Sequence, residues 1–381
     1  MGPTFAAALS EHPLATQAVG EVVGQVLESL GTPPDVAMLF VTGPHAGALE
    51  DIARAVRRLV NPRVLVGATA VSVLGGSQEV EETPGIVLWA ARFDVDVEPV
   101  RLEAIPTADN LFVAGGGVLN RNDGTLLLVA DPFSFPVEQV LGHLRESAPD
   151  VAIVGGMASA ARGPGGNVLV LDDELFRSGA VGVWLPPTVP ITTVVSQGCR
   201  PIGQPFVVTK AERNVIYELA GQEALSRLNE TIDSLSDHDK RLLANGLHIG
   251  HVIDEQRIDY GRGDFLIRGV LGADRKIGAI AIGDEVPVGA TVQFQVRDAE
   301  SADEDLHALI DGQRARGALV FTCNGRGSNL FGTPGHDAEV VSEQTGGAVA
   351  GMFCAGEFGP VGSVNFVHGF TASIALFGAQ R

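Results

Sequence analysis

The chain has 381 residues, of which 45% are hydrophobic, so it is long enough to bury a large core and to form two or three domains. Its 46 acidic and 26 basic side chains give a net charge of −20, which disfavours nucleic acid and anionic membrane as partners. It contains no run of about 18 apolar residues that could span a membrane, and its start lacks the pattern of a secretory signal, so we expect a cytoplasmic protein.

The first part of the chain alternates between predicted helices and buried strands. Apolar residues recur at spacings of three and four over 12–31, which predicts an amphipathic helix. The short, continuously apolar stretch 36–43 predicts a buried strand, and 46–60 predicts a second helix. Two further strands are expected within 63–70 and 85–93.

The same order of elements recurs within 124–185 and again within 317–378. Each occurrence contains a buried strand, a short helix, a strand that ends in a turn of small residues, and another apolar strand. The three turns read "VGATA", "VGGMAS" and "CAGEFG", so Gly67, Gly156 and Gly356 lie where the backbone can approach another group closely. We interpret this pattern as an internal duplication.

The segment between the second and third occurrences differs from them. Strands are expected around the turn at 198–205, followed by a helix from about Val215, and then a mostly antiparallel section over 264–298. We expect a mixed α/β (α+β) fold in two halves, with mixed β-sheets covered by helices. The expected boundary lies near Phe206, giving domains of residues 1–205 and 206–381.

Several familiar motifs are absent from the sequence. It contains no GxxxxGK[ST], GxGxxG, GxSxG or HExxH pattern. The run "HIGH" at 248–251 matches a nucleotide-binding signature of some synthetases, but its late position favours a chance match. The three cysteines lie far apart without a CxxC, which indicates reduced thiols and neither a disulfide framework nor a zinc site.

Two loops carry arginines that are candidates for binding an anion. Arg200 follows Cys199 in a turn held by two prolines, although an interdomain linker explains this turn equally well. Arg326 lies between glycines, close to Cys323 and Asn324, directly after a predicted buried strand. Its planar fork of donors suits a carboxylate or a phosphate, and the alternative is a surface loop in which it pairs with an acidic residue.

The last repeat adds a carboxylate and an imidazole. Glu357 stands between two glycines near a strand end, where it could pair with Arg326 or accept a ligand amine. His368 lies in an apolar segment, where a structural role is the commoner outcome. With Cys323 and Cys354 in the same repeat, a cysteine-dependent enzyme is an open alternative, although a buried cysteine usually acts as a small apolar side chain.

Segments of both halves resemble the FIST domain family. The segments that carry the resemblance in the C half are "CRPIGQPFVVTKAERNVIYEL", "GALVFTCNGRGSNLFG", "GMFCAGEFGP" and "FVHGFTAS", in this order. The N half contributes "AMLFVTG", "LVGATAVSVLGG" and "VGGMASA". The resemblance extends from about Asp35 to about Phe377, with an N-like domain in 1–205 and a C-like domain in 206–381.

The resemblance implies a bacterial sensory module that binds a small ligand such as an amino acid or a related metabolite. The family occurs alone, fused to bacterial signalling domains and in eukaryotic F-box proteins, and some bacterial members are described as haem-binding nitric oxide sensors. No kinase, cyclase or methyl-accepting segment is attached to this chain, so its signal would pass through a separate partner. The expected ligand-binding residues are Arg200, Cys323, Asn324, Arg326, Gly327, Gly356, Glu357, His368, Gly67 and Gly156.

Our leading hypothesis is a non-catalytic cytoplasmic sensor of an amino acid or related small carboxylate, with Arg326 on the ligand carboxylate and Glu357 on an amine or on Arg326 itself. No cofactor is expected under this hypothesis. A haem-based gas sensor with His368 or another histidine as an axial ligand is the second hypothesis, in which haem is held without a CxxCH attachment. A cysteine-dependent enzyme is the third, and an interaction scaffold without any ligand is the fourth.

Overall fold

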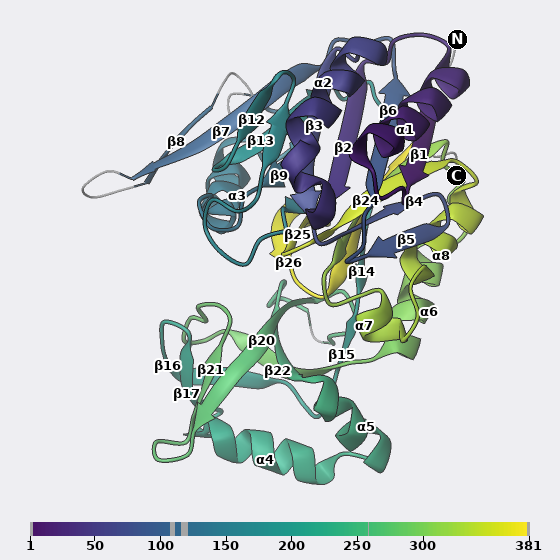
Figure 1. Cartoon of the computed structure of the whole chain (residues 1–381). Helices are drawn as coiled ribbons and strands as arrows, with labels where there is room; N and C mark the ends of the chain where they lie inside the picture. Colours follow the sequence, from purple (N-terminus) through teal and green to yellow (C-terminus); the bar gives the residue numbers. More distant parts are fainter. Residues whose placement is uncertain (1–2, 107–110, 116–120, 258, 379–381) are drawn as a thin grey trace. The chain divides into compact units, whose positions relative to one another are not determined.

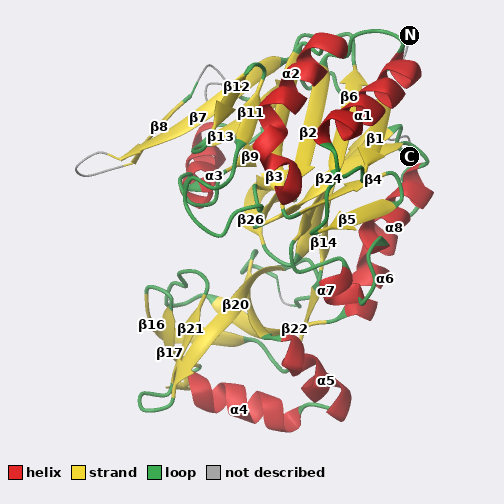
Figure 2. Cartoon of the chain, viewed as in Figure 1, coloured by secondary structure: helices red, strands yellow, loops and turns green. Residues whose placement is uncertain are grey.

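The computed structural model describes residues 3–106, 111–115, 121–257 and 259–378 (Figure 1). By its internal contacts the chain divides into two compact units. Unit 1 consists of Met1–Val195, His307–Val367 and Thr371–Arg381, and unit 2 of Ser196–Leu306 and His368–Phe370. The expected mixed α/β fold is confirmed, as the mixture of helices and strands in Figure 2 shows. The expected boundary between residues 205 and 206 stays a prediction.

Unit 1 contains three copies of one strand–helix–strand–strand motif. The first copy is β2 (Val36–Thr42), α2 (Leu49–Leu59), β3 (Val64–Ala70) and β6 (Ile86–Arg92). The second is β9 (Thr125–Ala130), α3 (Val137–Ser147), β10 (Ala152–Met157) and β13 (Ala180–Leu185). The third is β23 (Gly317–Cys323), α8 (His336–Thr345), β24 (Ala348–Cys354) and β27 (Thr371–Phe377).

The three copies also share their strand pairing, which confirms the expected repeat. In each copy the first two strands are parallel, and the last strand runs antiparallel beside the first. A glycine occupies the same register position of the second strand in every copy, namely Gly67, Gly155 and Gly351. An added Cβ there would lie much too close to the carbonyl oxygen opposite: 2.4 Å for Gly67 and Leu39, 1.8 Å for Gly155 and Leu128, and 1.8 Å for Gly351 and Val320. The expected alignment of Gly67 with Gly156 and Gly356 is therefore wrong, because these last two lie one and five residues beyond the equivalent positions.

Each copy gives its hairpin to the sheet of a different copy. The hairpins are β4 (Ser72–Gly75) with β5 (Gln78–Glu81), β11 (Leu169–Leu171) with β12 (Glu174–Phe176), and β25 (Glu357–Val361) with β26 (Val364–His368). β4 of the first copy pairs with β24 of the third, β11 of the second with β3 of the first, and β25 of the third with β10 of the second. This exchange is cyclic, so each sheet is completed by another copy.

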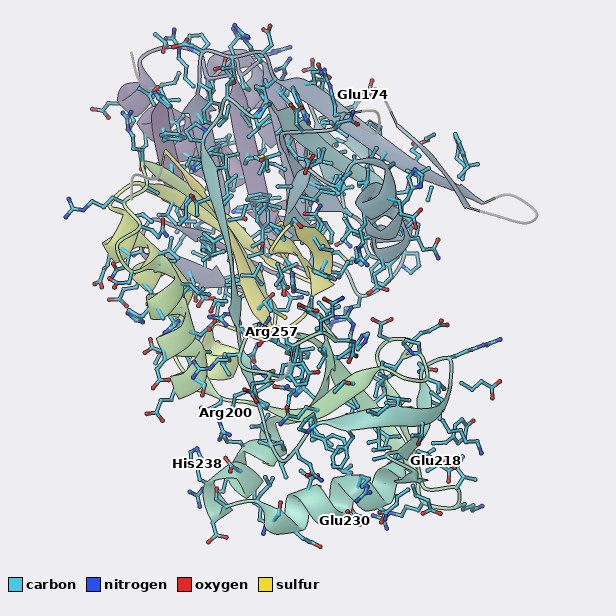
Figure 3. All side chains as sticks on the ribbon, turned by 180° about the vertical axis from the view of Figure 1, so that it is seen from behind. Glu174, Arg200, Glu218, Glu230, His238 and Arg257 are labelled. Carbon is cyan, nitrogen blue, oxygen red and sulfur yellow. The ribbon has the colours of Figure 1, made fainter. Side chains whose placement is uncertain are left out.

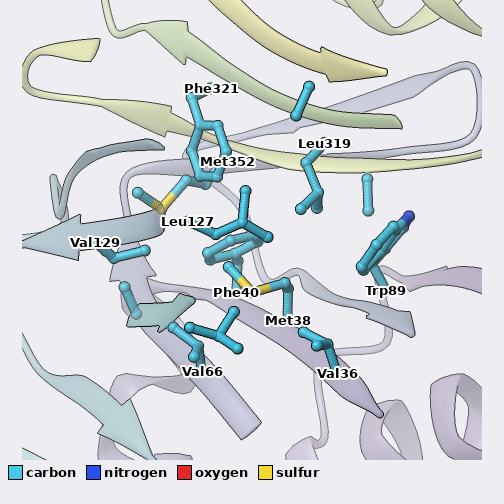
Figure 4. Close-up of a cluster of buried hydrophobic side chains, with 14 of the residues drawn as sticks. Val36, Met38, Phe40, Val66, Trp89, Leu127, Val129, Leu319, Phe321 and Met352 are labelled. Carbon is cyan, nitrogen blue, oxygen red and sulfur yellow. The ribbon is translucent and has the colours of Figure 1, made fainter. Parts of the chain in front are cut away.

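One apolar core joins the three copies. It contains alternate side chains of the central strands, including Phe40, Trp89, Leu127, Phe321 and Met352 (Figure 4). The opposite face of the first sheet is covered by α1 (Ala15–Leu30) and α2, and that of the second sheet by α3. Strands buried on both faces read as continuous apolar runs, which is why the sequence predicted them. The outer strands beside the last strand of each copy are β1 (Thr4–Ser10), β7 (Glu98–Pro106) with β8 (Leu111–Ala114), and β14 (Ile191–Gln197).

Unit 2 is a closed antiparallel barrel. Pairing runs through β22, β16, β17, β21, β20 and β19 and returns to β22, with β15 beside β22. Closure leaves no free edge in this ring. The strands are β15 (Cys199–Pro201), β16 (Phe206–Glu212), β17 (Val215–Leu219), β19 (Leu247–Val252), β20 (Phe265–Asp274), β21 (Ala279–Ile282) and β22 (Thr291–Arg297).

The expected helix from about Val215 is wrong, because residues 215–219 form β17 and the helix α4 spans Ala224–Ser234. Val215, Ile216 and Tyr217 are β-branched or aromatic and pack well on a pleated surface. The remaining elements are η1 (Gly43–Ala48), β18 (Gln222–Glu223), α5 (Asp237–Leu242), η3 (Leu243–Asn245), α6 (Ala299–Ile310) and α7 (Ser328–Phe331). Among the described residues, the helices are all too short or too polar to cross a membrane.

Candidate functional site

The ends of β23 and β24 bring polar side chains together in unit 1. These parallel strands are register partners up to Cys323 and Cys354, so the loops that follow them begin side by side. Arg326 lies in the first loop and Glu357 just after the second, and both side chains are buried. The carboxyl ends of parallel strands are where α/β proteins usually bind ligands, which makes this edge the candidate site.

Arg326 forms a buried two-point ion pair with Asp337, in the first turn of α8. Its Nε donates to Asp337 Oδ2 at 2.7 Å and its Nη2 to Oδ1 at 2.8 Å, and both side chains are fully buried. Thr322 donates its hydroxyl to Oδ2 at 2.6 Å, and His336 Nδ1 lies 3.0 Å from Oδ1. Burial acts to raise the pKa of Asp337, but Arg326 outweighs it and holds that pKa well below its ordinary value. The pair is therefore charged at neutral pH.

Glu79 of β5 completes the start of α8. Its Oε2 accepts the backbone N–H of Gly335 at 2.8 Å, and its Oε1 accepts those of Asp337 at 3.1 Å and Ala338 at 3.2 Å. A carboxylate at this position satisfies N–H groups that lack partners within the helix. Burial, and then the charge of Asp337, raise the pKa of Glu79 to about 7. Glu79, which belongs to the first copy, therefore holds the start of α8 in the third copy.

Glu357 is the second carboxyl group of the cluster, and it is fully buried. Its Oε2 accepts hydrogen bonds from Thr371, at 3.3 Å from the backbone N–H and 2.8 Å from the hydroxyl. Burial raises its pKa to about 8, against the opposing effects of Thr371, Arg326 and Cys323. Glu357 is therefore mostly protonated at pH 7, so its carboxyl group can donate a hydrogen bond as well as accept one.

The cysteines lie within the same cluster. Cys354 is buried, and burial together with the neighbouring Glu357 raises the pKa of its thiol well above the ordinary value. A thiol in this state is a poor nucleophile. Gly156 of β10 packs against it, since an added Cβ would lie 2.3 Å from Cys354 Sγ. Cys323 is partly exposed, and its Sγ accepts the backbone N–H of Gly325 at 3.4 Å.

The fold brings most of the expected site residues together. Asn324 donates its backbone N–H to the Cys354 carbonyl at 3.0 Å, and the Gly356 carbonyl accepts the N–H of Met157 at 2.8 Å. Gly327 precedes the first residue of α7. The expected residues at this edge are Gly156, Cys323, Asn324, Arg326, Gly327, Gly356 and Glu357.

Three expected residues lie elsewhere. Gly67 is in the middle of β3, where its missing Cβ makes room for the Leu39 carbonyl. Arg200 belongs to unit 2, where it forms ion pairs with Asp239 and, at 2.5 Å, with Asp298 (Figure 3). His368 is buried and is also assigned to unit 2. A ligand-binding role for these three residues stays a prediction.

Sequence reasoning missed two central residues, Asp337 and Glu79. Asp337 had a usable signal, because an acidic residue just after the glycine of "TPGHD" is typical of a helix start. Glu79 had none, since it lies more than 250 residues before the helix that it contacts. Within the described part of the chain, no group of three or more histidine, cysteine or acidic side chains could hold a metal ion.

Comparison with known proteins identifies the class. Residues 35–222 match the FIST N domain and residues 224–360 match the FIST C domain, and such domains are sensory domains of signal transduction proteins. The chain belongs to the FIST family. It is 42% identical over 373 residues to an uncharacterized protein of Mycobacterium bovis, covering 96% of both chains. It is 41% identical over 377 residues to another of Mycobacterium tuberculosis, covering 97% of this chain and 98% of the relative.

Proposed function

We propose that this protein is a non-catalytic cytoplasmic sensor that binds an amino acid or a related small carboxylate at the edge formed by β10, β23 and β24. It would pass its signal to a separate protein. FIST domains bind small ligands and relay signals, which supports the general part of this proposal. The particular site and ligand rest on the chemistry of the cluster described above.

The observation that carries the proposal is the state of Glu357. Glu357 is fully buried and burial raises its pKa to about 8, and carboxyl groups with strongly raised pKa values are concentrated at functional sites. A protonated carboxyl group beside the positive charge of Arg326 suits a ligand carboxylate, which accepts strong, charge-assisted hydrogen bonds. Arg326 Nε and Nη2 both donate to Asp337. We therefore assign the ligand contact to Glu357 first and treat Arg326 as the source of positive potential.

A sequence difference between the third copy and the other two also supports a ligand site at this edge. Three residues after the glycine shared by all copies, the first and second copies have Ala70 and Ala158, whereas the third has Cys354. Packing alone explains the two alanines, whereas the cysteine belongs to the polar cluster. The haem sensor and the cysteine-dependent enzyme stay predictions that no contact of the described residues favours, and the raised pKa of Cys354 counts against that thiol as a nucleophile.

The first test is native mass spectrometry of the purified protein, followed by denaturation to release any bound molecule. A small acid or amino acid that co-purifies supports the proposal and identifies the ligand, whereas a haem mass supports the gas sensor instead. When no molecule is released, thermal unfolding with the common amino acids and small dicarboxylates finds a weakly bound ligand.

Calorimetry with the identified ligand then tests Glu357. Glu357→Met removes the hydrogen bonds and is expected to weaken binding at least tenfold, because a charge-assisted hydrogen bond contributes about 1.5–3 kcal/mol. Glu357→Gln keeps a neutral donor, so it retains affinity if the carboxyl group binds a ligand carboxylate and loses affinity if it binds an amine. Glu339→Gln, at an exposed position of α8, is the matched control. Unchanged affinity in Glu357→Met would remove this edge from the site.

A further inference from the structure

The outer face of the barrel in unit 2 carries buried polar side chains. Along β19 and β22, Ile249 and Phe294 point into the barrel core, so the alternate residues His248 and Gln295 point outward. These two are register partners and lie side by side on that face. Outward positions of a barrel usually meet water, yet His248 is only 4% exposed and Gln295 only 1%.

These side chains have polar atoms without hydrogen-bond partners in the described structure. The atoms are His248 Nδ1 and Gln295 Nε2, and both residues are at least nine-tenths buried. Burying such groups unpaired costs about 1–3 kcal/mol each, so buried polar groups nearly always have a partner. The set therefore points to a molecule that supplies the missing hydrogen bonds.

The surroundings of these atoms are aromatic and contain open space. The ring of Phe370 packs against that of His248, with centroids 4.2 Å apart. Phe370 has a φ of 62°, in the left-handed region that bulky residues rarely adopt, and such strain is found mostly where function requires it. Gly269 is the register partner of His248 on β20, and an added Cβ there would have no atom within 4 Å. Cys199 and Phe265 form an apolar cluster on this face.

The hydrogen-bonding atoms themselves are uncharged. Burial, followed by the charge of Arg297, lowers the pKa of His248 to about 4, so its imidazole is neutral at pH 7. A neutral imidazole has one donor nitrogen and one acceptor nitrogen. Gln295 Nε2 can only donate. A complementary molecule accepts a hydrogen bond from Gln295 Nε2 and donates one to the acceptor nitrogen of His248, and it needs no charge.

We propose that this outer face of the unit 2 barrel, at His248 and Gln295, is a second binding site that takes a small, planar, uncharged amide or lactam. The amide oxygen accepts a hydrogen bond from Gln295 Nε2, and the amide N–H donates to the acceptor nitrogen of His248. The ring packs in the aromatic surroundings of Phe370. This site shares no residue with the proposed carboxylate site of unit 1, so the two proposals can fail separately.

The test uses the full chain and three probes: nicotinamide and uracil, which are planar neutral amides, and nicotinate, which replaces the amide of nicotinamide by a carboxylate. Nicotinamide or uracil is expected to raise the midpoint of thermal unfolding saturably, with nicotinate at least tenfold weaker. Gln295→Met is expected to weaken binding at least tenfold. The same variant should leave the ligand-free protein as stable as the wild type or more stable, because it removes a buried donor that lacks a partner.

Gln293→Met is the matched control, because Gln293 lies on the same face of β22 but donates to the Gly203 carbonyl at 2.9 Å. It should lower stability and leave probe binding unchanged. Should Gln295→Met fail to fold, the wild-type protein is labelled with ¹⁵N at its histidines and titrated with nicotinamide in an NMR experiment. The proposal then requires the chemical shifts of the His248 ring nitrogens to change saturably. The proposal is overturned if neither neutral probe binds, if Gln295→Met binds as the wild type does, or if a crystal soaked in nicotinamide has only ordered water on these atoms.

Discussion

At the scale of single residues, the burial of Glu357 makes the stability of the protein depend on pH. Its pKa of about 8 in the folded protein compares with 4.5 for an ordinary glutamate, so the folded state keeps a proton that the unfolded state releases between these values. The free energy of unfolding therefore falls as the pH rises from about 4.5 to about 8, the reverse of the usual carboxylate in an ion pair. Glu79, with a pKa of about 7, adds to the same trend.

Glu357→Gln is therefore expected to reduce the loss of stability between pH 6 and pH 9 by about 1 kcal/mol or more. Urea denaturation at the two pH values measures this difference. Glu339→Gln, on the exposed side of α8, should keep the full wild-type dependence. An unaltered dependence in Glu357→Gln would mean that Glu357 is ionised in the folded protein at neutral pH.

The sequence predicted Arg326 and Glu357 as site residues because charged groups between glycines after apolar strands are uncommon, and the structure places both after the paired strands β23 and β24. Their role in binding a ligand stays a prediction. The sequence did not identify the partner of Arg326. Asp337 lies eleven residues further along in a helix, and only the packing of α8 on β23 and β24 brings it to the guanidinium.

At the scale of elements, the shared glycine of the second strand is the clearest structural requirement. Gly351 has no room for a Cβ, because the Val320 carbonyl would lie 1.8 Å away. Gly351→Ala is therefore expected to lower the free energy of unfolding by about 1–3 kcal/mol or more, as overpacking does.

Gly142→Ala is the control for this substitution. Gly142 is exposed in the middle of α3, and an added Cβ meets no atom within 4 Å. Alanine there should stabilise the protein by about 1 kcal/mol through helix propensity. Chemical denaturation of the two variants compares them directly, and a neutral effect of Gly351→Ala would contradict the close approach of β24 to β23.

Elements were predicted well where their apolar pattern is unambiguous, as in β2, β9 and β23. The prediction was wrong at Val215–Leu219, where a short apolar run suits a strand as well as a helix. Pairing with β16 and β21 decided the outcome there, and no local signal in the sequence reports on that pairing.

At the scale of the whole molecule, the cyclic exchange of hairpins ties distant parts of the chain into one unit. The segment 224–360, which matches the FIST C domain, lacks β4, β14 and β27 of the third copy's sheet. Expressed alone, it is expected to remain largely unfolded. Residues 196–306 contain every strand of the closed barrel and its core, so this fragment is expected to fold by itself.

Circular dichroism and two-dimensional NMR of the two fragments measure this difference. Dispersed amide signals and a cooperative thermal transition are expected for 196–306 only. A folded 224–360 fragment would show that the third copy is stable without the hairpin of the first, and would contradict the importance assigned to the exchange.

The sequence by itself determined the mixed α/β class, the threefold repetition and the glycine-bounded loops that carry Arg326 and Glu357. It could do so because apolar periodicity, glycine and charge are properties of neighbouring residues. The tertiary structure alone decided that Asp337 and Glu79 complete the cluster, that Arg200 pairs within the barrel, and that His248 and Gln295 are buried on its outer face. These facts depend on contacts between residues far apart in the chain, and such contacts are selected by the free energy of the whole fold.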